Sequence, residues 1–480
     1  MDIKFIELRK KYGDPRSPEF DEEFLKENDT HINPYTIPTI LRYRPPRAPV
    51  YTIDPESSTD ADDAFSIYTL NDKLILAIHI ADPTDYVSIE SKLWEDIKKR
   101  AVTSYPSNYA PYHMLPRDIL DKSSLKLKEG LVSEYKKCVS IFVEIDKKTK
   151  LPIDETAELK FCAIELRKTP CNSYESAAKY MSTNSNTIIH LGVKIAEAME
   201  TKRGGLSSRL NTDPVSVVRY KDGKPFMKKD TKIVHQVKNM IAQFAIYANS
   251  FVGRFLSKHL GDLGIYRTCD AEDIGDHTDS SANELMNAIV RNGVDADYRH
   301  TPSAHDIVGV KKYSHFTSPI RRASDMVVHY LLKYIFLKKL NYFGNTVFNL
   351  APPFTDKDLK TIANSCYNIS KMNRKINREE AKLRLIQLID EKKPVNVLVR
   401  FTSYIKERFL NCMITKIDEY DVSLSIVFKV TYSTVLPDKA DRLMHTTISK
   451  VYPLKKFDAD IFPTLKYACI SYFLLKKKKK

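Results

Sequence analysis

The sequence carries the stretch Asp54-Pro-Glu-Ser-Ser-Thr-Asp60-Ala-Asp62-Asp63 between two short apolar segments, 51–53 and 64–67. Four aspartates fall within this stretch, and the last two are adjacent. Carboxylates at this density do not all remain ionised unless a cation compensates them. The apolar flanks predict strands, so the pattern indicates an acidic loop held between strands rather than a solvated acidic tail.

Hard oxygen ligands of this kind suit Mg²⁺, which keeps water ligands and completes its coordination with substrate phosphates. The loop therefore predicts metal-dependent phosphodiester chemistry. An EF-hand calcium loop is excluded, because it requires Gly at the sixth and Glu at the twelfth position. Counted from Asp60, those positions hold Phe65 and Asn71. An acidic surface loop without metal stays open as the alternative.

The composition favours a multidomain globular protein with a polyanionic partner. The chain has 480 residues, 42% of them hydrophobic, which is enough for a substantial core. Its net charge is +15, so its field would attract nucleic acid. The simpler alternative is that the charge only keeps the protein soluble.

The seven cysteines are scattered, and no pair has the C-x-x-C spacing of zinc sites. This predicts reduced thiols and a cytoplasmic location. The N-terminus has no apolar signal core, and no apolar run approaches the roughly 20 residues that span a bilayer. We therefore expect no membrane partner, and the sequence implies no obligate protein partner.

Along the chain, residues 41–49 are rich in Pro and Arg and predict an extended linker. Its Arg42, Arg44 and Arg47 are candidates for phosphate contacts, or for merely keeping the linker soluble. The spacing and charge of several segments predict helices over 91–102, 185–201, 231–259 and 355–390. Short apolar runs predict strands over 73–81 and 137–145 and about five short strands from 395 onward. Five such strands suit a small OB-like barrel.

A second candidate site is the segment Ser314-His-Phe-Thr-Ser-Pro-Ile-Arg-Arg322. Ser318 and Pro319 predict the cap and the first residue of a helix. Arg321, Asp325 and His329 would then share one polar face. Arg321 could grip a phosphate bidentately near the helix N-terminus. The alternative is an Arg321–Asp325 ion pair that only stabilises the helix.

Together these motifs resemble the ribonuclease II (RNB) family of 3′-to-5′ exoribonucleases. The resemblance rests on four segments: 53–64, 77–82 (Ala-Ile-His-Ile-Ala-Asp), 113–117 (His-Met-Leu-Pro-Arg) and 315–322. It implies an α+β fold in which an RNB catalytic domain, a mixed β-sheet with helices, precedes a small all-β OB-like barrel. The expected boundaries are an N-terminal extension at 1–48, the RNB domain at 49–392, the barrel at 393–456 and a poly-Lys tail at 457–480.

The resemblance also implies the site and the reaction, which is processive hydrolysis of single-stranded RNA to 5′-nucleoside monophosphates. The metal ligands would be Asp54, Asp60, Asp62 and Asp63, holding Mg²⁺ with Mn²⁺ as an alternative ion. Asp62, Asp63 and Arg321 would be the catalytic residues. The RNA-binding residues would be Tyr105 and Tyr174, which would stack on bases, with Tyr313, Arg322 and Glu380; Glu379 is the rival of Glu380.

Some positions depart from the family pattern. In the segment 203–209, Ser207 and Ser208 replace the usual acidic and aromatic residues, and Gln243 stands where an acid is common. The N-terminal extension is too short for paired cold-shock domains, which suggests a reduced, viral-type version in which the barrel and the Lys tail capture RNA. One alternative is a catalytically decayed RNB-like RNA-binding protein. Another is an endonuclease or phosphatase that would use metal ions held by the same aspartates.

Overall fold

The computed structural model describes residues 3–477 with several gaps. The gaps are 15, 107–109, 207, 209–215, 222–223, 262, 272–284, 286–294, 344–349, 393, 407–408, 422–426, 433–442 and 454–469. Ser207 and the last three lysines thus lie outside the described residues. None of the described helices combines the length and apolar character that a membrane span needs.

The larger, N-terminal part of the chain is built on a four-stranded antiparallel sheet in the order β1-β2-β3-β4. Its strands are β1 (Asp63–Leu70), β2 (Lys73–Ala81), β3 (Ser133–Ile145) and β4 (Glu158–Arg167). The predicted strand over 73–81 is confirmed to the residue. Asn71 and Asp72 join β1 to β2 with φ of 46° and 63°, which is the geometry of a two-residue hairpin turn.

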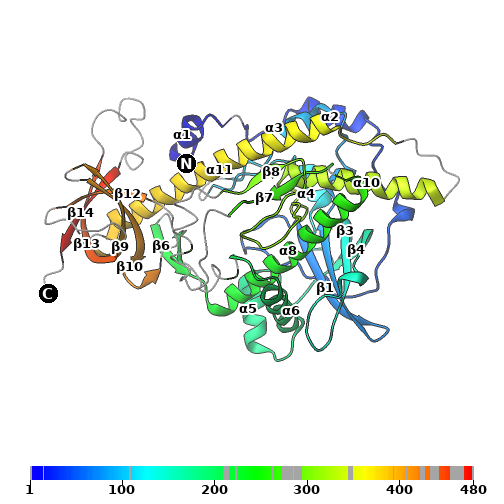
Figure 1. The fold of residues 1–480 in the computed structure, drawn as a ribbon, viewed down its shortest axis with the longest axis horizontal. Coiled ribbons are helices and arrows are strands. Elements are labelled where there is room, and N and C mark those ends of the chain that lie inside the picture. The colour runs from blue at the N-terminus through cyan, green and yellow to red at the C-terminus, as the bar shows by residue number, and fades with distance from the viewer. Residues whose placement is uncertain are drawn as a thin grey trace.

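Helices lie beside the sheet and over one of its ends (Figure 1). The principal helices are α3 (Lys92–Arg100), α4 (Arg117–Ser123), α5 (Tyr174–Thr183), α6 (Ile188–Arg203), α8 (Lys232–Leu260), α10 (Ala323–Phe343) and α11 (Asp356–Lys392). Phe244 of α8 packs on Phe65 of β1, with ring centroids 5.4 Å apart. Phe336 of α10 packs on Phe161 of β4 at 5.1 Å. The expected α+β class is confirmed.

Two small sheets and two N-terminal helices complete this region. The antiparallel two-stranded sheets are β5 (Ser216–Lys221) with β6 (Lys224–Lys229), and β7 (Tyr266–Thr268) with β8 (Asp297–Arg299). The N-terminal helices are α1 (Ile3–Lys11) and α2 (Glu22–Thr30). Figure 1 shows α1 beside α11, the long helix that leads from this region to the C-terminal strands.

The C-terminal strands close into a ring of pairings, β9-β10-β12-β14-β13-β9. The strands are β9 (Val395–Lys406), β10 (Phe409–Ile417), β12 (Val427–Tyr432), β13 (Leu443–Pro453) and β14 (Ile470–Lys477), with β11 (Tyr420–Asp421) at the edge of β10. This five-stranded ring agrees with the expected OB-like barrel. The expected end at 456 is wrong, because β14 pairs with both β12 and β13.

The N-terminal extension is not a linker. Tyr35 and Ile37 are buried in the main core. Tyr43 N–H donates to Phe161 O at 2.8 Å, and Tyr43 O accepts from Ala163 N–H at 3.0 Å, so this segment runs parallel to β4 at its edge. Residues on both sides of position 48 pack in one hydrophobic core, so the boundary expected there does not separate two folded units.

Arg42 lies in a buried charge network rather than on a phosphate-binding surface. Its Nη2 lies 2.9 Å from Asp82 Oδ2 and 2.6 Å from Asp85 Oδ2. Lys333 of α10 approaches the same two carboxylates at 3.1 and 2.5 Å. Burial opposes the ionisation of Asp82, but Lys333, His329 and Arg42 outweigh it and hold its pKa well below the ordinary value. The network ties the extension to α10.

We expect Arg42→Ala to lower the free energy of unfolding by about 3–5 kcal/mol, because it leaves buried carboxylates short of one cation. Arg47→Ala is the matched control. The Arg47 side chain is 83% exposed and its Nε lies 3.9 Å from Glu165 Oε2, so we expect a loss below about 1 kcal/mol. Urea denaturation followed by circular dichroism measures both. Equal losses in the two variants would contradict the assignment.

Candidate active site

The acidic loop is fastened at three points next to the sheet. Asp62 O accepts from Ala81 N–H at 2.8 Å, where β2 ends. Ala61 N–H donates to Ser124 Oγ at 3.0 Å. Asp54 O accepts from Tyr174 N–H at 3.1 Å, at the first residue of α5. The carboxylates therefore gather at one end of the β1–β2 hairpin.

The four carboxyl groups interact electrostatically. Burial raises the pKa of Asp62 to about 7, although Arg321 acts in the opposite direction. Burial also raises the pKa of Asp54, and the neighbouring charges of Asp63, Asp62 and Asp60 raise it further. One oxygen of Asp60, Oδ2, is buried without a hydrogen-bond partner. The cluster holds more negative charge than the surrounding side chains neutralise.

Arg321 comes to this cluster from a position 259 residues away along the chain. Its Nε donates to Asp62 Oδ2 at 2.8 Å, and the Ile320 N–H donates to Asp62 Oδ1 at 2.8 Å. A further bond from Arg321 Nη2 to Ser318 Oγ, at 2.9 Å, orients the guanidinium. Burial lowers the pKa of Arg321, but Asp62, Tyr105 and Asp63 together raise it above the ordinary value, so the side chain stays charged.

The predicted helix start at Pro319 is wrong, since α10 begins at Ala323. Asp325 Oδ1 accepts the Ser318 N–H at 2.9 Å, and Ser318 O accepts the Arg322 N–H at 3.0 Å, so the preceding residues turn outside the helix. The alternative Arg321–Asp325 pair is also wrong: Arg322 Nη2 binds Asp325 Oδ1 at 2.8 Å. Arg321 is thereby left to face the carboxylates.

The donor set fits a hard divalent cation. All four candidate ligands are carboxylates, one of their oxygens is buried without a partner, and burial raises the pKa of Asp54, Asp62 and Asp63. Within the described ranges, however, no three acidic, His or Cys side chains are arranged closely enough to hold an ion. Both oxygens of Asp62 already accept hydrogen bonds from Arg321 and Ile320. An ion bound here would therefore compete with Arg321 for Asp62.

Two predicted base-stacking tyrosines lie close enough to the cluster to interact with its charges. The pKa of Tyr105 is raised by burial and then by Asp60 and Asp62, and the side chain is 47% exposed. The pKa of Tyr174 is raised by burial and then by Asp54 and Asp63. Tyr174 is half-buried at the start of α5. Their rings could therefore contact a substrate that reaches the carboxylates, and their stacking role stays a prediction.

Three other predicted RNA-binding residues have different surroundings. Tyr313 is 6% exposed, and its hydroxyl accepts from Asn249 Nδ2 at 3.1 Å. The Tyr313 ring is buried in this structure, and its RNA-binding role stays a prediction. Arg322 is next to Arg321 and paired with Asp325. Glu380 lies buried on α11, 3.8 Å from Arg384 Nη2, and its role stays a prediction.

Sequence reasoning missed Asn249 on the buried face of α8. Its Oδ1 accepts the N–H groups of Phe316 and Thr317 at 2.8 and 3.3 Å. This side chain holds the segment that leads to Arg321. The available signal was a polar residue on an otherwise apolar helix face, which burial permits only when its hydrogen bonds are satisfied.

Gln243, one of the departures from the family pattern, is buried in a polar network. Its Oε1 accepts from Arg203 Nη1, and its Nε2 donates to Asn239 Oδ1 at 3.0 Å. Arg203 Nε also donates to Val308 O at 2.8 Å. Gln243 thus positions Arg203 at the end of α6. Its hydrogen bonds go to Arg203 and Asn239 and not to the aspartates of the candidate site.

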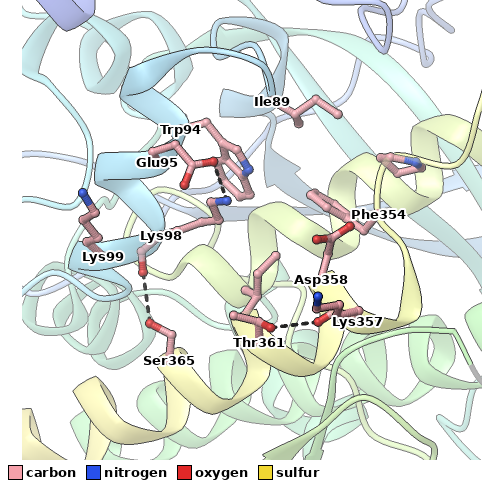
Figure 2. Close-up of a pocket in the computed structure, with 12 residues that line it drawn as sticks. Ile89, Trp94, Glu95, Lys98, Lys99, Phe354, Lys357, Asp358, Thr361 and Ser365 are labelled. Atoms are coloured by element: carbon pink, nitrogen blue, oxygen red, sulfur yellow. Dashed lines mark hydrogen bonds and ion pairs between the residues drawn. The ribbon is translucent and has the colours of Figure 1, made fainter.

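A separate crevice of about 400 Å³ lies between α3 and the start of α11 (Figure 2). None of the predicted site residues lines it. Lys98 is paired with Glu95 at 2.6 Å, and Asp358 accepts from Thr355 N–H and Oγ1 at 2.9 and 2.6 Å. Ser365 Oγ donates to Lys98 O at 3.4 Å, so these polar groups stabilise the helix contact.

The family model of the RNB domain matches residues 46–338, more than half of the chain. The chain belongs to the RNB family. An exoribonuclease 2 from Psychromonas ingrahamii is 26% identical over 371 residues, which are 68% of this chain and 54% of that protein. The chain spans about half the length of the curated relatives it matches.

Solved RNB structures share the fold. RNase R of Mycoplasma genitalium, in complex with ribose-methylated single-stranded RNA, superposes with a TM-score of 0.73 at 16% identity, covering 99% of this chain and 78% of that one. Yeast Ssd1, described as a pseudonuclease, superposes with a TM-score of 0.68 at 15% identity, covering 97% and 60%. These likenesses establish the architecture alone.

We expect the metal-free protein to lose stability as pH rises from about 4 to about 7 because of Asp62. Its pKa is near 3.8 when unfolded and about 7 when folded. In this window the folded state binds more protons than the unfolded state, so the free energy of unfolding falls as pH rises. Urea titrations in EDTA measure the decline.

Asp62→Asn cannot ionise at this position and should show a shallower decline over the same pH window. An equally steep decline in the variant would show that Asp62 does not carry the effect.

Proposed function

We propose that this protein is a metal-dependent 3′-to-5′ exoribonuclease that hydrolyses single-stranded RNA processively to 5′-nucleoside monophosphates. The observation that carries the proposal is the contact of Arg321 with Asp62 inside a cluster of four buried or half-buried carboxylates. Membership of the RNB family supports it, as do relatives named exoribonuclease 2 and ribonuclease R.

In this proposal, Asp54, Asp60, Asp62 and Asp63 hold Mg²⁺, or Mn²⁺ in its place. Bound ions would supply an activated water and neutralise charge on the leaving oxygen. The permanently charged Arg321 would stabilise the negative charge that develops on the phosphoryl oxygens. No single aspartate is assigned as the base, because coupled carboxylates share their protons.

Tyr105 and Tyr174 would hold the terminal bases by stacking. Stacking is worth about 1–3 kcal/mol per base and tolerates any sequence, as a degradative enzyme requires. The net charge of +15 would draw the RNA backbone to the protein. The five described free thiols are compatible with action in the cytoplasm.

The second candidate function is RNA binding without cleavage. The pseudonuclease Ssd1 shares the fold, and Gln243 replaces an acid that is common in the family. The complete set of four aspartates and Arg321 argues against this alternative, since a decayed nuclease has no need of these residues.

An assay with 5′-labelled single-stranded RNA and Mg²⁺ tests the proposal. We expect the parent protein to produce a ladder that shortens from the 3′ end. Asp62→Asn should abolish it, and Arg321→Ala should slow it by roughly 10²–10³-fold. Arg117→Ala is the control, because that side chain is 57% exposed and pairs with Asp121 on α4.

Binding of the labelled RNA without any cleavage by the parent would overturn the proposal and favour the second candidate. Internal cuts would indicate an endonuclease instead.

A further inference from the structure

The N-terminal segment contains a second buried charge cluster, made of Arg9, Asp14 and Arg16. Arg16 binds the Asp14 carboxylate with two parallel bonds, Nε to Oδ1 at 2.8 Å and Nη2 to Oδ2 at 2.7 Å. Arg9 Nε donates to Oδ2 at 2.7 Å. Burial opposes ionisation, but the bonds from Arg16 and Arg9 lower the pKa of Asp14 to about 2.

This cluster contacts the loop that carries Tyr105, which we define as residues 101–106 and 112–114. Arg16 Nη1 donates to Val102 O at 2.8 Å. The Arg9 guanidinium carbon lies 3.7 Å from the centre of the Tyr112 ring, which is close enough for a cation–π contact. The cluster therefore contacts the Tyr105 loop near both of its ends.

The same loop is bonded to the backbone around Arg321. Thr103 N–H donates to Arg321 O at 3.0 Å, and Ala323 N–H donates to Ala101 O at 2.8 Å. Inside the loop, Ser104 and Tyr112 exchange two backbone bonds of 3.1 and 2.9 Å. Tyr105 follows Ser104 directly, so its ring is presented from a backbone held between the Arg9–Asp14–Arg16 cluster and the Arg321 segment.

Two further contacts fix the N-terminal segment itself. Arg16 Nη2 donates to Asn373 Oδ1 on α11 at 3.1 Å. Arg100, the last residue of α3, donates to Ser17 O and Glu19 O, each at 2.7 Å. The segment is thus hydrogen-bonded to α11 and to α3, two elements distant from it along the chain.

We propose that the cluster of Arg9, Asp14 and Arg16 is a positioning element of the active site, which holds the Tyr105 loop against Arg321 and so determines where the Tyr105 ring meets the terminal base of the RNA. The inference rests on the proposed function. A side chain on a loop keeps a defined position only when a rigid scaffold supports the loop. Tyr105 is 47% exposed, so the packing of its own ring cannot supply that support.

The test compares Asp14→Asn and Arg16→Lys with the parent by hydrogen exchange and by steady-state kinetics on a short single-stranded RNA. Arg16→Lys keeps the charge but loses the two parallel bonds. Two controls act at the other end of the sheet. Glu144→Gln removes a carboxylate paired with Lys73 at 2.8 Å, and Ile145→Val trims a buried side chain.

We expect both cluster variants to speed exchange of the Thr103, Ser104 and Tyr112 amides at least tenfold, while the controls do not. We expect KM to rise by roughly fivefold or more with kcat nearly unchanged, because base stacking is weakened while the carboxylates and Arg321 are intact. If Asp14→Asn does not fold, Arg16→Lys carries both measurements.

Two outcomes would overturn the proposal. Unchanged loop exchange would show that the cluster does not hold the loop. Faster exchange with unchanged KM would show that the loop is held but does not set RNA binding. If the parent cleaves no RNA at all, the proposed function fails, and the affinity for non-cleaved RNA then replaces KM as the measure of positioning.

Discussion

The buried carboxylate of Asp62 is the group on which the rest of the site depends. Burial makes its ionised form costly. The Arg321 guanidinium and the Ile320 backbone N–H, both from the segment before α10, stabilise that form by donating hydrogen bonds to it. For those donors to arrive, the end of the β1–β2 hairpin and the start of α10 must lie together. Asn249 of α8 then holds the intervening backbone through the N–H groups of Phe316 and Thr317.

Arginines of the N-terminal extension pair with buried carboxylates at two further places. Arg42 supplies charge to Asp82 and Asp85, while Arg9 and Arg16 supply it to Asp14. A buried carboxylate is tolerated when it is paired and fully hydrogen-bonded, and it is costly to strip of its partner. Both networks join the extension to elements that flank the active site, α10 in one case and the Tyr105 loop in the other. The extension is therefore part of the same folded unit as the candidate site.

Local patterns predicted elements well wherever local forces decide them. A short apolar run rich in Ile and Leu located β2 to the residue, and turn-forming Asn71 and Asp72 join it to β1 in the geometry such residues favour. Predictions failed where long-range contacts overrode local preference. Ser318 and Pro319 are good helix starters, yet α10 begins four residues after Pro319, because Asp325 captures the Ser318 N–H. The barrel was predicted to end at 456, because its last strand follows a long interval and carries lysines that suggest a solvated tail.

The sequence by itself determined the chemistry available: four aspartates in ten residues, an Arg-Arg pair after Ser-Pro-Ile, and a strongly basic chain. Residue type and spacing are enough for that, because charge and ligand preference belong to side chains. Only the tertiary structure decided which groups meet. It paired Arg321 with Asp62 rather than Asp325, buried Tyr313, and turned Arg42 inward. Those outcomes depend on burial and on partners that lie 40 to 259 residues away along the chain, which no local pattern encodes.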